Sequence, residues 1–191
     1  MRKIPTLFER NYDGNCLVRD AVVPGTEWVL EGEGIATEKY DGTACLVREG
    51  QLFARYDCKV GRTPPQGFES AQDADPVSGH WPGWVPVTNG PEHQYHREAF
   101  SSLSHPEHGR TLELVGPKVQ KNPYKLSRHY LWEHGMPLAV LPPLDFEGLR
   151  TYLANRWIEG IVWHHADGRM AKIKRRDFGL SWPAEAEEVS K

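Results

Sequence analysis

A lysine, an aspartate and a glycine lie close together in the tetrapeptide Lys39-Tyr40-Asp41-Gly42. The short apolar segment 35–36 precedes it and the strand-like run 44–47 follows it, so we expect a strand–turn–strand junction here. At such a junction the lysine amine can point into a cleft, where a lowered pKa would make it a covalent nucleophile. The alternative is an ordinary hairpin turn with a surface lysine, because Asp-Gly is a strong turn signal.

Two glutamates and a pair of lysines lie farther along the chain, in segments that we expect to be strands. Glu113 interrupts the apolar run 111–115, and Glu159 stands near the start of the run 158–165. A turn at 166–169 leads into the returning strand 170–176, where Lys172 and Lys174 share one face because strand side chains alternate. Plainer alternatives are a polar face exposed to water for Glu113 and an edge strand protected against aggregation for the lysines.

Strands are the main elements that must position these residues. We also expect short strands at 16–18, 28–30, 51–56 and 129–132, and a long irregular segment at 63–90 that is ordered, since it contains tryptophans. A helix is expected over 95–103, and a second over 146–155 with Asp145 as its N-cap. The sequence therefore predicts an α+β fold, and we expect one domain over residues 1–191 because no linker separates two cores.

Composition limits the classes of function. The net charge of −3 means that contacts with nucleic acid would depend on local basic patches. We find no apolar run long enough to span a bilayer and no signal-peptide pattern. The cysteines are three and widely spaced, at Cys16, Cys45 and Cys58, which argues against a disulfide framework and a cysteine zinc site. A reducing, cytoplasmic setting is therefore expected. A histidine metal site is a weaker alternative, because no tight ligand spacing connects His80, His93, His96, His105 and His108.

The charged groups follow one another in a definite order along the chain. Lys39-x-Asp41-Gly42, then Glu113, then Glu159-Gly160 and then Lys172-x-Lys174 resemble motifs I, III, IV and V of the covalent nucleotidyltransferase superfamily, which contains ATP-dependent RNA and DNA ligases and mRNA capping enzymes. One KxDG match is weak evidence, but the ordered set is far more specific. Within the superfamily the chain is most similar to the small 5′-to-3′ RNA ligases of the RNA ligase 1 family, through residues 37–43, 79–84, 113–120, 159–163 and 172–178.

Two departures separate the sequence from DNA ligases and capping enzymes. DNA ligases have an arginine two residues after the KxDG glycine, whereas this chain has Ala44, so Arg55 is the expected substitute, as in RNA ligases. We also expect no OB-fold after motif V, where DNA ligases and capping enzymes carry one. The resemblance therefore implies an ATP-grasp-like ligase adenylation domain, with two antiparallel sheets flanking a nucleotide cleft and no C-terminal OB-fold.

The resemblance also implies a reaction with ATP and RNA. Lys39 would attack the α-phosphate of ATP, the AMP would pass to an RNA 5′-phosphate, and a 3′-hydroxyl would then displace AMP. These steps need mainly positioning and charge neutralisation. Lys172 and Lys174 would hold the α-phosphate and lower the pKa of Lys39, and Asp41 would orient Lys39.

The remaining implied roles concern the nucleotide, a divalent ion and the RNA. Glu159, with Asp41 and Glu113, would bind Mg²⁺ or Mn²⁺ chiefly through water. Glu113 would also accept hydrogen bonds from the ribose. The other implied nucleotide contacts are Glu38 at the adenine edge, Gly42 at the turn, Arg55 at the ribose or the RNA end, and Trp132 or Tyr130 stacked on the base. RNA backbone contacts are expected from Lys59, Arg62, Lys118, Lys121, Arg175 and Arg176.

Three other functions stay open at this point. A capping-type guanylyltransferase or a DNA ligase would use the same lysine chemistry. A nucleotide- or RNA-binding module that has lost catalysis would keep the fold without forming a covalent adduct, although the intact set of lysines and glutamates argues against it.

Overall fold

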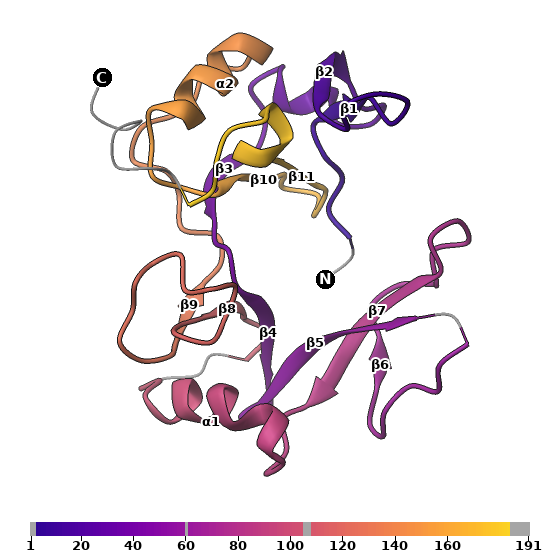
Figure 1. Ribbon diagram of the computed structural model, residues 1–191, viewed down its shortest axis with the longest axis vertical. Coiled ribbons are helices and arrows are strands. Elements are labelled where there is room, and N and C mark those ends of the chain that lie inside the picture. The colour runs from indigo at the N-terminus through magenta and orange to yellow at the C-terminus, as the bar shows by residue number, and fades with distance from the viewer. Residues whose placement is uncertain (1–2, 60, 105–107, 184–191) are drawn as a thin grey trace. The chain divides into compact units, whose positions relative to one another are not determined.

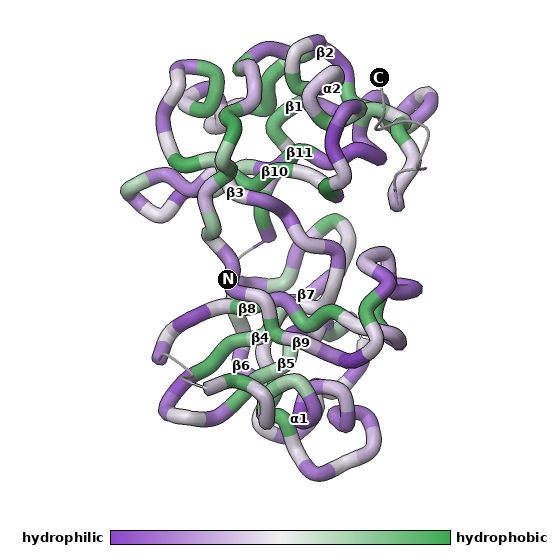
Figure 2. The backbone as a smooth tube through the Cα atoms, turned by 90° about the vertical axis from the view of Figure 1, so that its left-hand side faces the viewer, coloured by the Kyte–Doolittle hydropathy of each residue, from purple (hydrophilic) through white to green (hydrophobic). Residues whose placement is uncertain are grey.

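The computed structural model describes residues 3–59, 61–104 and 108–183, which form two compact units (Figure 1). Unit 1 contains Lys3 and the described part of Asp41–His134, and unit 2 contains Ile4–Tyr40 and the described part of Gly135–Lys191. The chain thus leaves unit 2 after Tyr40, builds almost all of unit 1, and returns to unit 2 at Gly135. Each unit has its own buried apolar cluster, and hydrophobic stretches run through both (Figure 2).

Unit 1 is built on a six-stranded antiparallel sheet. Its strand order is β6 (Glu69–Ser70), β7 (His80–Pro86), β5 (Gln51–Lys59), β4 (Thr43–Arg48), β8 (Thr111–Val115) and β9 (Tyr130–Glu133). The turn η2 (Pro91–His93) leads into α1 (Gln94–Ser101), which packs through Ala99 against one face of the sheet. The buried residues of that core are Cys45, Val47, Leu52, Ala99, Leu112, Leu114, Val119 and Leu131.

The opposite face of this sheet carries different residues, because strand side chains alternate. Glu113 lies directly opposite Ala44 on β4 and opposite Trp132 on β9. Since Leu112 and Leu114 point toward α1, Glu113 and its two cross-strand neighbours point away from it. Unit 1 therefore presents a carboxylate and an indole side by side on the face that α1 does not cover.

Unit 2 contains a three-stranded antiparallel sheet of order β11 (Met170–Lys174), β10 (Gly160–His164) and β3 (Ile35–Lys39). Around it lie the two-stranded sheet of β1 (Phe8–Arg10) and β2 (Val18–Val22), the helix α2 (Phe146–Ala154), and the short helices η1 (Glu27–Val29) and η3 (Arg175–Phe178). Fully buried core residues include Leu7, Phe8, Val29, Leu149, Leu153, Ile161, Ala171 and Ile173.

Most of the predicted elements are present, and the α+β class is confirmed. The helix predicted over 146–155 is α2, and the Asp145 side chain caps it by accepting a hydrogen bond of 2.8 Å from the Gly148 N–H. The strand predicted at 28–30 was wrong, since residues 27–29 form a 3₁₀ helix. Two antiparallel sheets were expected, whereas the described residues form three.

The prediction that 63–90 is irregular was wrong in part, because the segment contains β6 and β7. Prolines and glycines concealed β7 in the sequence. Gly83 is needed within that strand, since a Cβ there would lie 2.3 Å from the Phe68 ring and 2.4 Å from the Glu69 carbonyl oxygen. The expectation of order was correct, and Trp84 is only 5% exposed.

Candidate active site

Three lysines share one face of the unit 2 sheet. Gly160 on β10 pairs with Lys39 on β3 and with Lys174 on β11, so the two lysines flank the glycine. One step along, Lys172 pairs with Val162 on the same face. The opposite face holds Ile161 and Ile173 in the buried core, so this lysine row, defined as Lys39, Lys172 and Lys174, lies on the side away from the core.

Gly160 at the centre of the lysine row cannot carry a side chain. An added Cβ would lie 2.2 Å from the Ile173 carbonyl oxygen and 2.9 Å from the Lys174 Cα. Both contacts involve backbone atoms, so no side-chain rotation could relieve them. The glycine of the Glu159-Gly160 pair is therefore required for β10 to lie this close to β11.

The amine of Lys39 is already paired. Its Nζ donates hydrogen bonds to Glu159 Oε2 at 2.6 Å and to the Tyr40 carbonyl oxygen at 2.9 Å. Glu159 is 6% exposed, and its own carbonyl oxygen accepts from the Arg175 N–H at 2.9 Å. The structure therefore brings motif I and motif IV together through a largely desolvated ion pair. The hairpin alternative for residues 39–42 was wrong, because β3 pairs with β10 while β4 pairs with β5 and β8.

The amine of Lys172 is perturbed by its surroundings. Burial, together with the positive charges of Lys39 and Lys174, lowers the pKa of Lys172 from 10.5 to about 8. The β11 edge is also partly covered, since the Lys172 N–H donates to the Pro5 carbonyl and the Leu7 N–H donates to the Lys172 carbonyl. These features argue against the alternative that Lys172 and Lys174 only protect a solvated strand edge from aggregation.

Glu113 in unit 1 uses both oxygens of its carboxylate. Oε1 accepts from the Gly42 N–H at 2.9 Å, and Oε2 lies 2.8 Å from His134 Nε2. Glu113 is 8% exposed, so its water-exposed alternative was wrong. Gly42 must be glycine for this contact, since a Cβ there would lie 2.2 Å from the Leu114 carbonyl oxygen.

The loop after β8 contributes two side chains that sequence reasoning missed. The Tyr124 hydroxyl accepts from the Asp41 N–H at 2.7 Å, and Gln120 Nε2 donates to the Gly42 carbonyl oxygen at 3.3 Å. With Glu113, they hold three successive peptide groups from Tyr40 to Thr43. Nothing in the sequence indicates these contacts, because they depend on the conformation of a loop.

His134 could have been found, since it lies two residues beyond Trp132, where a strand continuing past Glu133 would place it on the same face as Trp132.

The structure distinguishes the two aromatic candidates. Trp132 lies opposite Glu113, and its ring packs edge-on against Tyr124 with centroids 4.7 Å apart. Tyr130 lies opposite Val115 instead, and Arg128 covers its ring at 4.9 Å from the centroid. Trp132 is thus the aromatic residue beside the motif III glutamate.

The other predicted nucleotide contacts are more dispersed. Arg55 shares the Glu113 face of the unit 1 sheet and lies over the Trp84 ring at 5.1 Å, and burial lowers its pKa. Glu38 alternates with Lys39 and pairs with Ile161, so it lies on the other face of β3 from the lysine row. Burial raises the pKa of Glu38.

The structure contradicts one predicted RNA contact. Arg175 is fully buried and donates to the carbonyl oxygens of Leu153, Arg156 and Ser181, so it cannot lie on an RNA surface. The neighbouring Arg176 is exposed. For metals, no group of three or more His, Cys, Asp or Glu suited to hold an ion occurs in the described ranges, and His105 lies outside them.

Known proteins match this chain over most of its length. A family model described as RNA ligase 1 matches residues 102–191. The RNA ligase 1 of Mus musculus is 31% identical over 222 aligned positions, which cover 78% of this chain and 68% of the mouse protein. The RNA ligase 1 proteins of Rattus norvegicus and Danio rerio are 29% and 28% identical with the same coverage.

The chain belongs to the RNA ligase 1 family, and the resemblance found in its motifs is confirmed. No helix within residues 3–59, 61–104 and 108–183 has the length and apolar content needed to cross a bilayer.

Proposed function

We propose that this protein is an ATP-dependent RNA ligase that joins RNA 5′-phosphate and 3′-hydroxyl ends through an AMP carried on Lys39. The observation that carries the proposal is the lysine row around Gly160, in which the Lys39 amine lies 2.6 Å from Glu159 in a member of the RNA ligase 1 family. In the proposed fold, the whole chain is one nucleotidyltransferase domain.

The first step is attack by the Lys39 amine on the α-phosphorus of ATP. A P–N bond forms, the bond from that phosphorus to the bridging oxygen breaks, and pyrophosphate leaves. Lys39 must give up a proton to attack, and the Glu159 carboxylate is within hydrogen-bond reach to receive it. Lys172 and Lys174, on the same sheet face, would stabilise the negative charge that develops on the phosphate.

The later steps return Lys39 to its starting state. An oxygen of the RNA 5′-phosphate attacks the α-phosphorus, the P–N bond breaks, and the Lys39 nitrogen regains a proton. The 3′-hydroxyl of the other RNA end then attacks the 5′-phosphate, and AMP leaves as a phosphodiester forms. Each step is an in-line displacement that depends on positioning and charge.

Unit 1 would supply contacts to the nucleotide. Trp132 is the side chain we assign to stack on the adenine, because it lies opposite Glu113, the proposed acceptor for ribose hydroxyls. Gly42 and Asp41 form the turn after the nucleophile, and Arg55 is assigned to the ribose or the RNA end. Glu38 stays a candidate for the adenine edge.

A divalent ion, Mg²⁺ or Mn²⁺, fits the chemistry of the proposed donor set. Asp41, Glu113 and Glu159 offer carboxylate oxygens, which are the hard ligands that Mg²⁺ prefers. The oxygens of Glu113 and one oxygen of Glu159 already have protein partners, so contact through water fits better than a full protein cage. When bound, the ion would neutralise phosphate charge.

Incubation with ATP labelled in its α-phosphate tests the proposal. The protein should become covalently labelled, and Lys39→Ala should abolish the label. Lys39→Arg is the matched control that keeps the charge but not the nucleophile, and it should also stay unlabelled. No label on the unsubstituted protein, or label that persists in Lys39→Ala, would contradict the proposal.

The same assay separates the alternatives. Labelling by GTP in preference to ATP would select a capping-type guanylyltransferase. Sealing of nicked DNA but not of RNA would select a DNA ligase. Tight ATP binding without a covalent adduct would select a binding module.

A further inference from the structure

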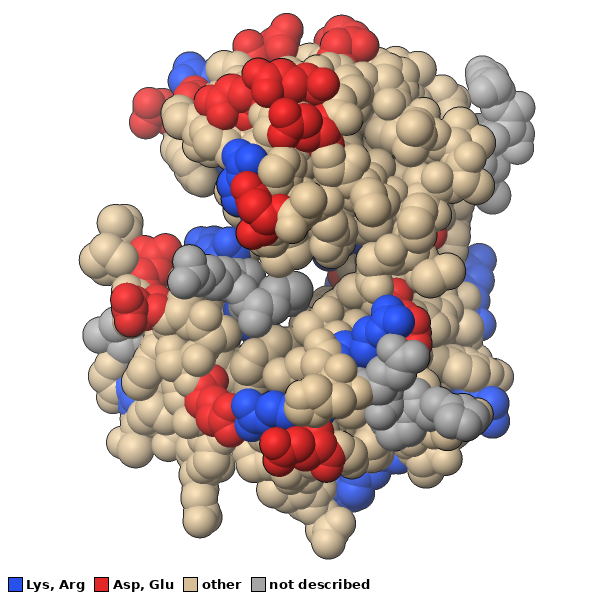
Figure 3. Space-filling view, turned by 180° about the vertical axis from the view of Figure 1, so that it is seen from behind, with Lys and Arg blue, Asp and Glu red and all other residues tan. Residues whose placement is uncertain are grey.

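The segment between β8 and β9 is the longest stretch of the candidate site without an acidic residue. Between Glu113 and Glu133 there is no Asp or Glu, while the cations Lys118, Lys121, Lys125 and Arg128 all lie within it and are exposed. We call residues 116–128 the basic loop. The net charge of −3 conceals this positive segment, because acidic residues elsewhere in the chain outweigh it. Figure 3 shows such acidic side chains gathered over unit 2 on one face.

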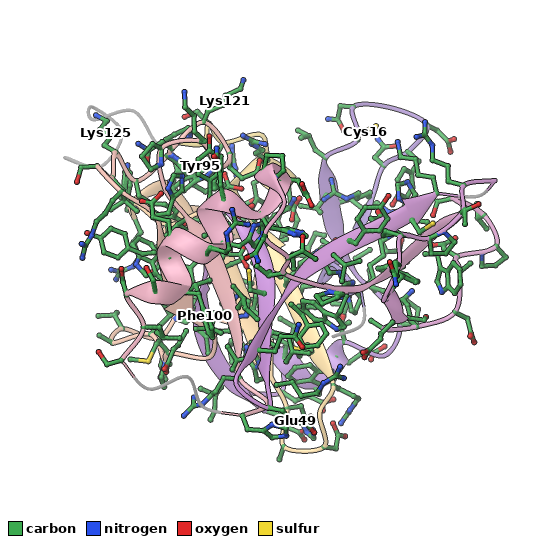
Figure 4. The ribbon with its side chains drawn as sticks, turned by 90° about the horizontal axis from the view of Figure 1, so that it is seen from below. Cys16, Glu49, Tyr95, Phe100, Lys121 and Lys125 are labelled. Atoms are coloured by element: carbon green, nitrogen blue, oxygen red, sulfur yellow. The ribbon has the colours of Figure 1, made fainter. Side chains whose placement is uncertain are left out.

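The basic loop has a defined and unusual conformation. Gln120, Lys121 and Asn122 all have left-handed backbone angles, with φ of 45°, 61° and 55°, and Lys125 has φ of 53°. Residues other than glycine rarely adopt this region, and strained segments of this kind cluster at ligand-binding sites. The sharp turn directs Lys121 and Lys125 away from the ribbon at the same corner of the molecule (Figure 4).

Several contacts hold the strained turn in place. The Asn122 side chain bonds both backbone groups of Leu126, with its amide donating to the carbonyl and its oxygen accepting from the N–H, each at 2.9 Å. Val119 is 8% exposed and belongs to the core of unit 1. The lysine side chains are therefore carried by a pre-organised backbone, which reduces the entropy lost when a ligand binds.

The basic loop is also attached to the turn after the proposed nucleophile. Tyr124 accepts from the Asp41 N–H at 2.7 Å, and Gln120 donates to the Gly42 carbonyl at 3.3 Å. A ligand bound by the loop lysines would therefore be held by the same segment that holds residues 41–42.

The chemistry of the loop favours a phosphodiester strand over an acidic peptide. Arg128 stacks on Tyr130 at 4.9 Å and donates to its hydroxyl at 2.9 Å, which places a planar cation and an aromatic ring at the end of a run of lysines. Aromatic and guanidinium planes beside cations are the usual features of a single-stranded RNA surface, where bases stack and phosphates pair with lysines.

We propose that the basic loop is the docking surface for the phosphate backbone of single-stranded RNA beside the Asp41–Gly42 turn, with Lys118, Lys121, Lys125 and Arg128 as its contacts. This rests on the proposed function for the identity of the ligand. The loop would deliver an RNA end to the segment that carries the Asp41–Gly42 turn.

Salt-dependent binding of a fluorescent single-stranded RNA with a 5′-phosphate tests the proposal. For each lysine removed, the slope of log K against log[salt] should fall in magnitude by about 0.7, and the affinity at 0.1 M salt should fall roughly fivefold. The full-length variants Lys121→Gln, Lys125→Gln and the double substitution should follow this series. Both lysines are exposed, so thermal unfolding should stay unchanged.

Arg110→Gln is the matched control. Arg110 is an exposed cation just before β8, at the opposite end of that strand from the basic loop, and it should leave the salt slope unchanged. An unchanged slope in the double variant, or an equal fall in Arg110→Gln, would overturn the proposal. Weaker binding of poly-glutamate with unchanged RNA binding would overturn it in favour of an acidic protein partner.

The labelling assay keeps the two proposals separate. If Lys39 takes no label from ATP while the RNA slope falls as expected, the ligase function fails and the docking surface stands. If Lys39 is labelled and the slope does not change, the docking surface fails alone.

Discussion

At the scale of single residues, Lys172 and Lys39 have different electrostatic surroundings although they share one sheet face. Lys39 is paired with the Glu159 carboxylate at 2.6 Å, whereas burial and two neighbouring lysines lower the pKa of Lys172 to about 8. A lysine with this pKa changes its charge in a range where enzymes are readily assayed. The amine proposed to hold the α-phosphate is therefore itself titratable under working conditions.

The rate of lysyl-AMP formation should fall as the pH rises through about 8, because Lys172 is positively charged below its pKa and neutral above it. Above this pH the rate should fall about tenfold per unit, as expected for one essential protonated group. Single-turnover labelling across a pH series measures this. Lys172→Arg should move the fall to higher pH, since a guanidinium stays charged. If the rate in Lys172→Arg still falls with the same midpoint pH, Lys172 is not the group whose charge controls the reaction.

Tyr124→Phe should slow lysyl-AMP formation by about fivefold to tenfold, because it removes one hydrogen bond of about 1 kcal/mol from the Asp41 N–H and keeps the ring beside Trp132. The half-saturating ATP concentration should stay the same, since the substitution affects the Asp41–Gly42 turn and not Trp132, the residue proposed to stack on the adenine. Tyr56→Phe makes the same chemical change on an exposed residue of unit 1 and should have no effect. A change in ATP affinity without a change in maximal rate would show that Tyr124 acts on the nucleotide instead.

At the scale of elements, the short helix η3 holds the C-terminal end of β11, the strand that carries Lys172 and Lys174. Asp177 is buried, accepts from the Lys174 N–H at 2.8 Å and forms an ion pair with Arg10. Arg175, which precedes it, donates to carbonyl oxygens at the C-terminal end of α2, where carbonyls lack helical partners. Arg175 and Asp177 are thus structural anchors, Arg175 linking the end of β11 to α2 and Asp177 linking it to Arg10.

Arg175→Met should lower the free energy of unfolding by roughly 3 kcal/mol or more, because one buried and two part-buried carbonyl oxygens would lose their donor. Urea denaturation measures this loss. Arg175→Lys should recover only part of it, since an ammonium cannot reproduce the guanidinium fork. The adjacent Arg176→Met, on an exposed side chain, should cost less than about 1 kcal/mol, and an equal loss at both positions would refute the anchoring role.

At the scale of the whole molecule, the sequence predicted the elements whose pattern is local. Alternation was enough to place Lys172 and Lys174 on one face and to mark Glu113 as an interruption in a buried strand. It could not indicate that β3 pairs with β10, which lies more than a hundred residues later, because the local sequence of a strand does not identify a distant partner strand. The ordered motifs compensated in part, since their resemblance implied that Lys39 and Glu159 belong to one nucleotide site.

The features that were missed depend on loops or on unusual strands. Tyr124 and Gln120 reach the Asp41–Gly42 turn only because the loop between them adopts left-handed angles, which lysine and glutamine do not signal. β7 contains two prolines and a glycine, which normally interrupt strands. Arg175 looks like a surface cation in a basic run, whereas its burial depends on carbonyl oxygens at the end of α2 and at Ser181.

The chain order of the two units has an evolutionary consequence. Thr37 bridges to Pro137, and the Leu138 N–H donates to the Ala36 carbonyl, so the backbone is paired just before it leaves unit 2 and again just after it returns. Residues gained or lost between these positions need not alter the register of the lysine row. The match to the mouse relative spans 222 positions, more than the 191 residues of this chain, so relatives carry additional sequence. We expect such length changes to accumulate in the loops of unit 1, because surface loops tolerate insertions and deletions better than the strands that they connect.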